Sequence, residues 1–273
     1  MPRYVKKYEL TSQRMTLRKG VVLRRIRALR DFACVRKGDL GGWVQSERNL
    51  GTDYNLAWVA GEAKVYGKAC VTGDAWVSGN AQVYGEALVK DEATVYENAQ
   101  ICGRSVVADC ANVCENAMVH GDAQVMGNAK VSGKAQIFGN AVVANCAIAR
   151  ENAKIYGNAE VHGNIQAFEN AEICGEAVMR CKALIGGEVK IEKTTDYVSI
   201  MPVWTGEGML TLTRCGMAFS AYFSMGWDEL WDECAKMPKQ HRNQFRKIIK
   251  FAKMFFRDCD LAKAKKKGGL YVK

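Results

Sequence analysis

The segment AWVAGEAKVYGKACVTGDAWVSGN, residues 57–80, consists of four consecutive copies of one six-residue pattern, Ala-x-Val-x-Gly-x. The pattern continues without insertion or deletion through residues 57–194, a stretch of 138 residues that holds 23 copies. The first place is Ala except at Ser105, Ile165 and Val189, and the third is Val or Ile except at Ala149, Ala167 and Met179. Hexapeptide repeats of this regularity are typical of a parallel β-helix.

Side-chain direction along a strand explains the residue found at each place. Successive residues of a strand point to opposite sides, so places one and three face inward while places two and four face outward. A small Ala beside a β-branched Val suits the interior of a narrow prism, and Val also favours strands. Places five and six hold turn-forming pairs such as Gly-Asn, Gly-Asp and Glu-Asn. A period of six cannot keep one apolar face on an α-helix, which excludes a helical repeat.

The fifth places indicate how many copies make one coil. When residues 18 apart are placed in columns, one column is Gly throughout: Gly67, Gly85, Gly103, Gly121, Gly139, Gly157 and Gly175. A second column holds Glu97, Glu115, Glu151 and Glu169, and a third holds Asp91, Asp109, Asn145 and Cys181. This sorting predicts a triangular coil of three hexads and a total of about 7.7 coils. At roughly 4.8 Å between stacked strands, the rod is about 35 Å long.

The hexads and the segment before them resemble a known group of proteins. The lead-in residues 26–32 (IRALRDF) and 37–44 (KGDLGGWV) strengthen the likeness. Together they resemble the YdcK-like branch of the hexapeptide-repeat left-handed β-helix proteins, which phages and prophages often carry. The resemblance implies that the coils are left-handed. The acyltransferases of this group place Gly directly after the aliphatic residue, whereas in this chain Gly falls one place later.

The repeat divides the chain into three parts. Residues 1–56 form a basic cap, residues 57–194 form the β-helix, and residues 195–273 form a small α+β module. In the cap, residues 8–10 and 21–32 are predicted strands that cover the otherwise open edge of the first coil. The predicted fold is therefore mainly β, a single left-handed parallel β-helix of about seven to eight coils with an N-terminal β cap.

The module after the repeat combines a predicted hairpin with helices. Residues 197–200 and 209–213 flank the turn signal TGEG, and residues 218–223 are a predicted third strand. A first helix is predicted near Asp228 and Glu229. From residue 238 a second helix carries apolar residues at i, i+3 and i+4 spacing, namely Phe245, Ile248, Ile249, Ala252, Phe255 and Phe256. Its other face is basic, with Arg242, Arg246, Lys247, Lys250, Lys253 and Arg257.

Charge is distributed unevenly along the chain. The net charge is +10, yet residues 1–37 carry +10 and residues 236–273 carry +11, which leaves −11 on the middle of the chain. This asymmetry favours an anionic partner, or attraction between the basic ends and an acidic rod of the same or another subunit.

The chain shows no targeting signal or membrane span. Residues 1–20 are basic and lack the apolar core of a signal peptide, and no run of 18 apolar residues occurs. The 11 Cys are scattered and form no CxxC pairs. These features predict reduced thiols in the cytoplasm, which is the host cytoplasm if a phage encodes the protein. No cofactor or metal site is expected, because no metal-ligand cluster is present.

Histidines are the candidates for catalysis. Hexapeptide acyltransferases, which use acyl-CoA, place a catalytic His in a cleft between subunits. Here His162 faces outward with Glu160 two residues earlier on the same side, which resembles a base with an orienting carboxylate. His120 faces outward elsewhere, and His241 lies in the predicted basic helix. No insertion interrupts the hexads to build a substrate cleft, so catalysis is the weaker interpretation.

One outward column is mostly aromatic and reads Tyr66, Tyr84, Cys102, His120, Phe138 and Tyr156, with Gln82, Gln100 and Gln136 beside it. Rings about 4.8 Å apart stack planar ligands such as nucleobases, or else stabilise the sheet by packing on one another. Four cap arginines supply positive charge: Arg24, Arg25, Arg27 and Arg30. We therefore expect the partner to be a small anionic, nucleotide-like ligand.

Another outward face carries a contiguous apolar patch of Leu88, Val106, Ala108, Met126, Val142 and Ala144. Exposed apolar area of this kind more often marks a protein interface than a small-molecule site, so we expect self-association as a trimer or dimer. The Glu column at the corners is either a cation site or an acidic solvated edge. Specific nucleic-acid binding is not expected, because no helix-turn-helix or other such module is present.

These features favour a non-catalytic, oligomeric β-helix that binds a small ligand. The phage resemblance implies a counter-defence role in which the protein sequesters a host nucleotide signal. An acyl-CoA-dependent acyltransferase is one alternative, and a purely structural assembly protein is another.

Overall fold

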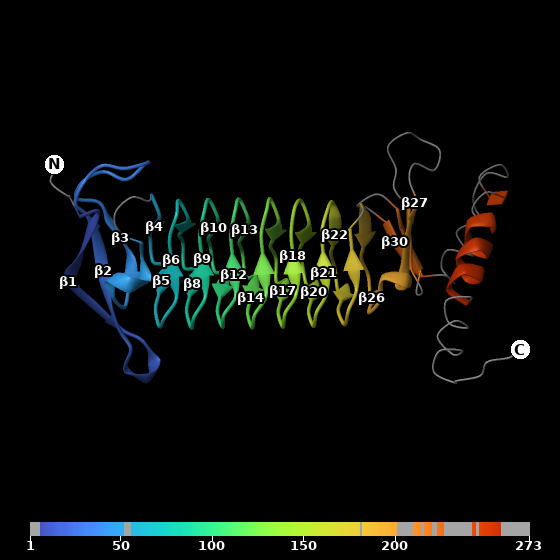
Figure 1. The fold of residues 1–273 in the computed structure, drawn as a ribbon, viewed down its shortest axis with the longest axis horizontal. Coiled ribbons are helices and arrows are strands. Elements are labelled where there is room, and N and C mark those ends of the chain that lie inside the picture. The colour runs from blue at the N-terminus through green and yellow to red at the C-terminus, as the bar shows by residue number, and fades with distance from the viewer. Residues whose placement is uncertain are drawn as a thin grey trace, which may run out of the picture.

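A computed structural model describes residues 6–51, 56–180, 182–200, 210–213, 216–219, 223–226, 242–243 and 246–257. The chain is mainly β and forms a straight rod of stacked coils, with a strand cap at the N-terminal end (Figure 1). No helix within the described residues has the length and apolar character needed to cross a membrane.

Each hexad forms one short strand at its second and third places and a turn at its fifth and sixth. The strands make three sheets, which are the three sides of the rod. Sheet 1 contains β5 Lys64–Val65, β8 Gln82–Val83, β11 Gln100–Ile101, β14 Met118–Val119, β17 Gln136–Ile137, β20 Lys154–Ile155, β23 Glu172–Ile173 and β26 Lys190–Ile191.

The other two sides are built in the same way. Sheet 2 contains β4 Trp58–Val59, β7 Trp76–Val77, β10 Thr94–Val95, β13 Asn112–Val113, β16 Lys130–Val131, β19 Ile148–Ala149, β22 Ile165–Ala167 and β25 Ala183–Ile185. Sheet 3 contains β6 Cys70–Val71, β9 Leu88–Val89, β12 Val106–Val107, β15 Gln124–Val125, β18 Val142–Val143, β21 Glu160–Val161 and β24 Val178–Met179.

Neighbouring strands of each sheet are parallel and offset by 18 residues. In sheet 1, Lys64 pairs with Gln82, which in turn pairs with Gln100. The triangular coil of three hexads is therefore confirmed, and the rod has about eight coils.

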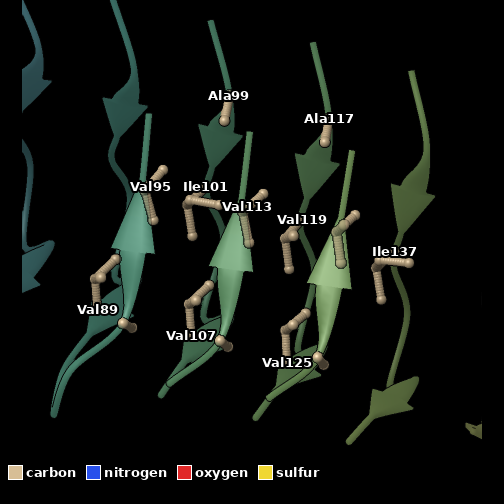
Figure 2. Packing of buried hydrophobic residues seen from close by; sticks show 14 of the residues in the cluster. Val89, Val95, Ala99, Ile101, Val107, Val113, Ala117, Val119, Val125 and Ile137 are labelled. Carbon is tan, nitrogen blue, oxygen red and sulfur yellow. The ribbon is translucent and has the colours of Figure 1, made fainter. Parts of the chain in front are cut away.

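The interior of the rod is filled by the first and third places of the hexads. Ala117 and Val119 are fully buried, as are their equivalents in nearly every coil. Figure 2 shows Val107, Val113 and Val119, one from each sheet, pointing into the shared interior. Each fully buried Val stabilises the fold by roughly 1.5–3 kcal/mol relative to an exposed one.

The corners between sheets require left-handed backbone at the fifth place. Apart from Lys193 in the last hexad, the described residues at this place have φ values between 55° and 75°, and several of them are acidic. Glu115 Oε2 accepts the backbone N–H of Gly133 at 2.7 Å, and Asp109 Oδ2 accepts that of Gly127 at 2.8 Å. An acidic residue at this place thus satisfies a corner amide of the next coil, which offsets the cost of its left-handed conformation.

The cap contains three antiparallel strands, β1 Tyr8–Thr16, β2 Val22–Ala28 and β3 Leu40–Val44. The predicted strands at 8–10 and 21–32 are confirmed, with shifted ends. Strand β3 lies parallel to β5 and pairs Trp43 with Lys64, so the cap continues sheet 1. Strand β1 is the terminal strand of this sheet and contains a bulge between Leu10 and Arg14.

Two short 3-10 helices lie in the cap, Arg18–Gly20 and Glu47–Asn49. The Asn49 side-chain amide donates to the carbonyl oxygens of Gly67 and Ala69 at 3.1 and 2.8 Å, which joins the cap to the first coil. Lys7 is fully buried beneath that coil, and its Nζ donates to the Ala57 carbonyl oxygen at 2.8 Å. Burial, reinforced by the nearby positive charge of Arg30, lowers the pKa of Lys7 to about 8.

After the rod, a 3-10 turn at Thr194–Asp196 leads into an antiparallel sheet of β27 Tyr197–Ile200, β28 Leu210–Thr213, β29 Gly216–Phe219 and β30 Phe223–Gly226. The predicted hairpin is confirmed as β27 and β28. The single third strand predicted at 218–223 is wrong, because Phe219 pairs with Phe223 and the chain reverses between them. The backbone N–H of Leu184 donates to Thr211 Oγ1 at 2.9 Å, which places β28 against the last coil.

The predicted basic helix is present at residues 242–243 and 246–257. Ile249, Ala252 and Phe256 are buried, whereas Phe251 and Met254 are exposed. The helix predicted near Asp228 and Glu229 lies outside the described residues, as do His241 and Phe245.

Candidate functional site

The aromatic column of sheet 1 forms a stack of parallel rings. The Tyr66 and Tyr84 ring centroids are 5.1 Å apart, with planes within 4° of each other. His120 lies 5.0 Å from Phe138, which lies 4.8 Å from Tyr156, and these planes agree within 2°. The separation equals the strand spacing, because each ring is borne by the neighbouring strand of an in-register sheet. We call these five rings the aromatic ladder.

The stacking determines which ring faces are open. Phe138 is covered on both faces by His120 and Tyr156, so it has no face for a ligand. Between Tyr84 and His120 the column contains Cys102, which is half-buried and carries no ring. We call this interruption the ladder gap. Cross-strand packing therefore accounts for six of the ten ring faces, and the faces of Tyr84 and His120 that border the gap are among the four that no other ladder ring covers.

Polar groups lie beside the ladder at the second places of the same strands. The Tyr156 hydroxyl donates to Glu172 Oε2 at 2.9 Å, and the Tyr66 hydroxyl lies 3.5 Å from Gln82 Oε1. The Gln100 side-chain amide, next to the ladder gap, makes no hydrogen bond within the described part of the chain. Its donor and acceptor are therefore available to a ligand.

Two ladder residues have shifted pKa values. A hydrogen bond with the Cys102 thiol, together with burial, raises the pKa of Tyr84 to about 12. Burial lowers the pKa of His120 below its usual value, since the charged imidazolium is disfavoured away from water. His120 is therefore a neutral stacking ring at pH 7 rather than a cation.

Arg25 is held by the cap rather than directed to solvent. Its guanidinium lies 5.1 Å from the Trp43 ring centroid, and its Nη1 is 2.9 Å from Glu62 Oε1. Its Nε donates to the Gly41 carbonyl oxygen at 3.0 Å. The Trp43 indole N–H also donates to Glu62, and this hydrogen bond is the main cause of the lowered pKa of that carboxyl. The cluster fixes β2 and β3 against the first corner of the rod.

The other three cap arginines differ in their surroundings. Arg27 Nη1 is 3.3 Å from Glu9 Oε1 on β1. Arg30 lies with its guanidinium carbon 5.8 Å from the Phe32 ring centroid. Arg24 is exposed. Of the four arginines predicted to bind a ligand, Arg24 and Arg27 are thus exposed, and Arg27 is paired with Glu9.

The candidate catalytic pair lies in a concave region of sheet 3. His162 Nε2 is 3.5 Å from Glu160 Oε2, and the same oxygen is 3.3 Å from Arg180 Nη2. A shallow pocket of about 420 Å³ is lined by these three residues together with Val142 and Asn145. The carboxylate lies between two cationic or potentially cationic groups. His120 is on another side of the rod and contributes nothing to this pocket.

The predicted apolar patch lies on sheet 3, beside this pocket. Leu88, Val106 and Val142 are half-buried at the second places of β9, β12 and β18. The fourth places of the same face hold Met126, which is half-buried, and Ala108 and Ala144, which are buried. The six residues therefore lie on one face of the rod, where the exposed Gln124 separates Val106 from Val142.

The corner carboxylates and the thiols show no arrangement suited to a metal. Three of the Glu column residues, Glu115, Glu151 and Glu169, accept backbone N–H groups of the next coil. Within the described residues, no group of His, Cys, Asp and Glu is arranged to hold a metal ion. The described cysteines are free thiols: Cys34, Cys70, Cys102, Cys110, Cys114, Cys146 and Cys174.

No family model matches the chain, and no curated protein does either. The sequence and the geometry of these sites are therefore the basis for assigning a function.

Some elements of the site were not predicted from sequence. Pairing of Arg25 with Trp43 and Glu62 joins residues from the cap and from the first hexad, and neither periodicity nor composition indicates it. The open faces at the ladder gap could have been inferred from the column itself. Cys102 interrupts an otherwise aromatic series, and strand register stacks that series ring on ring.

Proposed function

We propose that this protein is a non-catalytic, oligomeric β-helix that binds a small anionic, nucleotide-like ligand on sheet 1. The observation that supports this proposal is the aromatic ladder, in which the faces of Tyr84 and His120 at the ladder gap lie next to the Gln100 amide, which makes no hydrogen bond to any described residue. Aromatic side chains that present ring faces bind nucleobases by stacking. Hydrogen-bonding groups beside them read the edge of the base.

The biological role that fits this chemistry is sequestration rather than turnover. The hexads resemble the YdcK-like, phage-borne proteins with left-handed coils, and a phage gains from removing a nucleotide signal of its host. We place the protein in the cytoplasm on the basis of its free thiols. A net charge of +10 favours the approach of an anionic ligand.

Calorimetric titration with a panel of mononucleotides, dinucleotides and cyclic nucleotides tests the proposal. We expect at least one to bind with measurable affinity, and we expect His120→Ala to weaken it. Lys130→Ala, at an exposed position on sheet 2, serves as the control and leaves binding unchanged. A folded protein that binds none of the panel contradicts the proposal.

An acyl-CoA-dependent acyltransferase is a second candidate, supported by the pocket at Glu160, His162 and Arg180. In this scheme Glu160 orients the imidazole of His162, which removes a proton from the acyl acceptor. We expect any acyl transfer to be lost in His162→Ala and retained in His120→Ala. Transfer that persists when both histidines are replaced removes this candidate.

Self-association through the apolar patch of sheet 3 is the third element of the proposal. The patch is apolar and uncharged at its six positions, as is common in subunit interfaces. Light scattering is expected to show a dimer or trimer that Met126→Glu dissociates, whereas Thr94→Glu on sheet 2 has no effect. A monomer at all concentrations contradicts the oligomer, and with it a purely structural assembly role.

A further inference from the structure

We propose that the ladder gap is a binding site for a single nucleobase, which inserts between the rings of Tyr84 and His120. This inference rests on the proposed function and assigns its ligand-recognition site. It assigns the base, not the phosphate, as the group that sheet 1 recognises.

The strand register gives the gap the size of one ring. Tyr84 and His120 are two coils apart, which corresponds to roughly 10 Å at the spacing of stacked strands. Phe138 fills the equivalent interval between His120 and Tyr156, 5.0 Å from one ring and 4.8 Å from the other. A planar ring placed above Cys102 would therefore stack on both of its neighbours as Phe138 does.

The half-buried side chain of Cys102 carries no ring to fill this interval. Its sulfur extends from Cβ about as far as the first ring atom of a Phe would, so the remaining ring positions are unfilled. The thiol is the floor of the site and limits how deeply a base enters.

Hydrogen-bonding groups around the gap match the edge of a base. The Gln100 amide lies at the second place of the strand that leads to Cys102. It offers one acceptor and two donors that make no hydrogen bond within the part of the chain that the structure describes. An amide of this kind pairs with a base edge that presents a donor next to an acceptor, as adenine does. The neutral His120 ring forms the second wall, so the walls themselves carry no charge.

The number of open ring faces favours one base rather than a strand of nucleic acid. Single-stranded nucleic acid is bound by stacking successive bases on successive aromatic side chains. Along sheet 1, both faces of Phe138 are covered, and Tyr66 and Tyr84 cover each other. The interior of the ladder therefore accepts a single ring.

Replacement of Cys102 tests the assignment directly. Cys102→Phe fills the gap with a ring from the chain itself, and Cys102→Ala keeps the gap open while removing the thiol. In titrations with adenosine, adenosine monophosphate and the other common nucleosides, we expect Cys102→Ala to retain binding, because the gap stays open. Cys102→Phe is expected to lose about tenfold or more in affinity, since stacking on two faces is lost. Nucleosides and nucleotides should be affected alike.

Alkylation of the wild-type protein provides a second readout that does not depend on the folding of a variant. Iodoacetamide labelling of Cys102 is followed by peptide mass spectrometry, with the exposed Cys110 as the internal reference. A bound base should slow labelling of Cys102 and leave Cys110 unchanged. Equal affinity in both Cys102 variants, or binding without protection of Cys102, overturns this assignment but not the proposed function. A wild-type protein that binds no nucleoside or nucleotide overturns both.

Discussion

Gly103→Ala tests how closely successive corners of the rod approach each other. Gly103 lies at a corner with φ of +74°, and a methyl group there would lie 2.6 Å from the Gly121 carbonyl oxygen and 2.8 Å from its nitrogen. Both atoms are backbone, so the coils would have to separate. The left-handed conformation alone costs a non-glycine residue roughly 1–2 kcal/mol. Forced separation of packed backbone adds about 1–3 kcal/mol, by analogy with overpacked cores.

A matched control separates these two contributions. Gly20 has a similar φ of +77°, but a methyl group there would have no atom within 4 Å. Gly20→Ala should therefore lower the free energy of unfolding only by the cost of the left-handed conformation, about 1–2 kcal/mol. Urea unfolding followed by circular dichroism measures both losses, and amide exchange at Arg104, which donates to Gly121 at 2.7 Å, reports local opening. The reasoning is refuted if the two variants lose the same free energy of unfolding, or if exchange at Arg104 is unchanged in Gly103→Ala.

Three further predictions concern the core and the cap. Ile137→Ala should lower the free energy of unfolding in urea by about 2–5 kcal/mol, because Ile137 is fully buried. The side chain of Ile148 faces outward, so Ile148→Ala should lower it by less than about 1 kcal/mol. The pKa of Lys7 is lowered to about 8, so between pH 8 and 10.5 the unfolded chain holds a proton that the folded chain has released, and stability from this group rises with pH. The free energy of unfolding of the wild type relative to Lys7→Met should thus increase by about 3 kcal/mol over that range, and a constant difference would contradict the burial of Lys7. Arg25→Ala should lower the thermal stability of the cap and change the fluorescence of Trp43, whereas Arg24→Ala should do neither. Equal effects of the two substitutions would show that Arg25 is not held by Trp43 and Glu62.

The rod could be predicted from sequence because one short pattern specifies both local structure and long-range pairing. Ala and Val at alternate places define the inward side, and the sorted fifth places define the coil. Once the offset of 18 residues is known, every strand partner follows, and so does the aromatic ladder. The same register indicates that Cys102 leaves a gap, although the orientation of the neighbouring rings required the structure.

The cap and the C-terminal module were harder to predict because their contacts do not repeat. Lys7 lies in a basic segment that would ordinarily be exposed, yet it is buried under the first coil by contacts with residues 50 and more positions away. Arg25 was predicted to bind a ligand from its charge alone, and its partners Trp43 and Glu62 come from separate segments. The strand predicted at 218–223 contains no Gly, Pro, Asn or Asp, the residues that most often mark a turn, so the sequence gives little sign of the reversal between Phe219 and Phe223.

The bulge in β1 bears on whether these rods can polymerise. A regular coil stacks on any identical coil, so a rod with a straight, bare end would recruit further copies and grow into a fibril. In β1 the pairing pattern is broken between Leu10 and Arg14, and Ser12, Gln13 and Arg14 face water. The backbone N–H and C=O groups of an incoming strand would therefore not align with those of β1. Both terminal segments also carry a strong positive charge, which disfavours end-to-end association of two rods and so favours a particle of finite length.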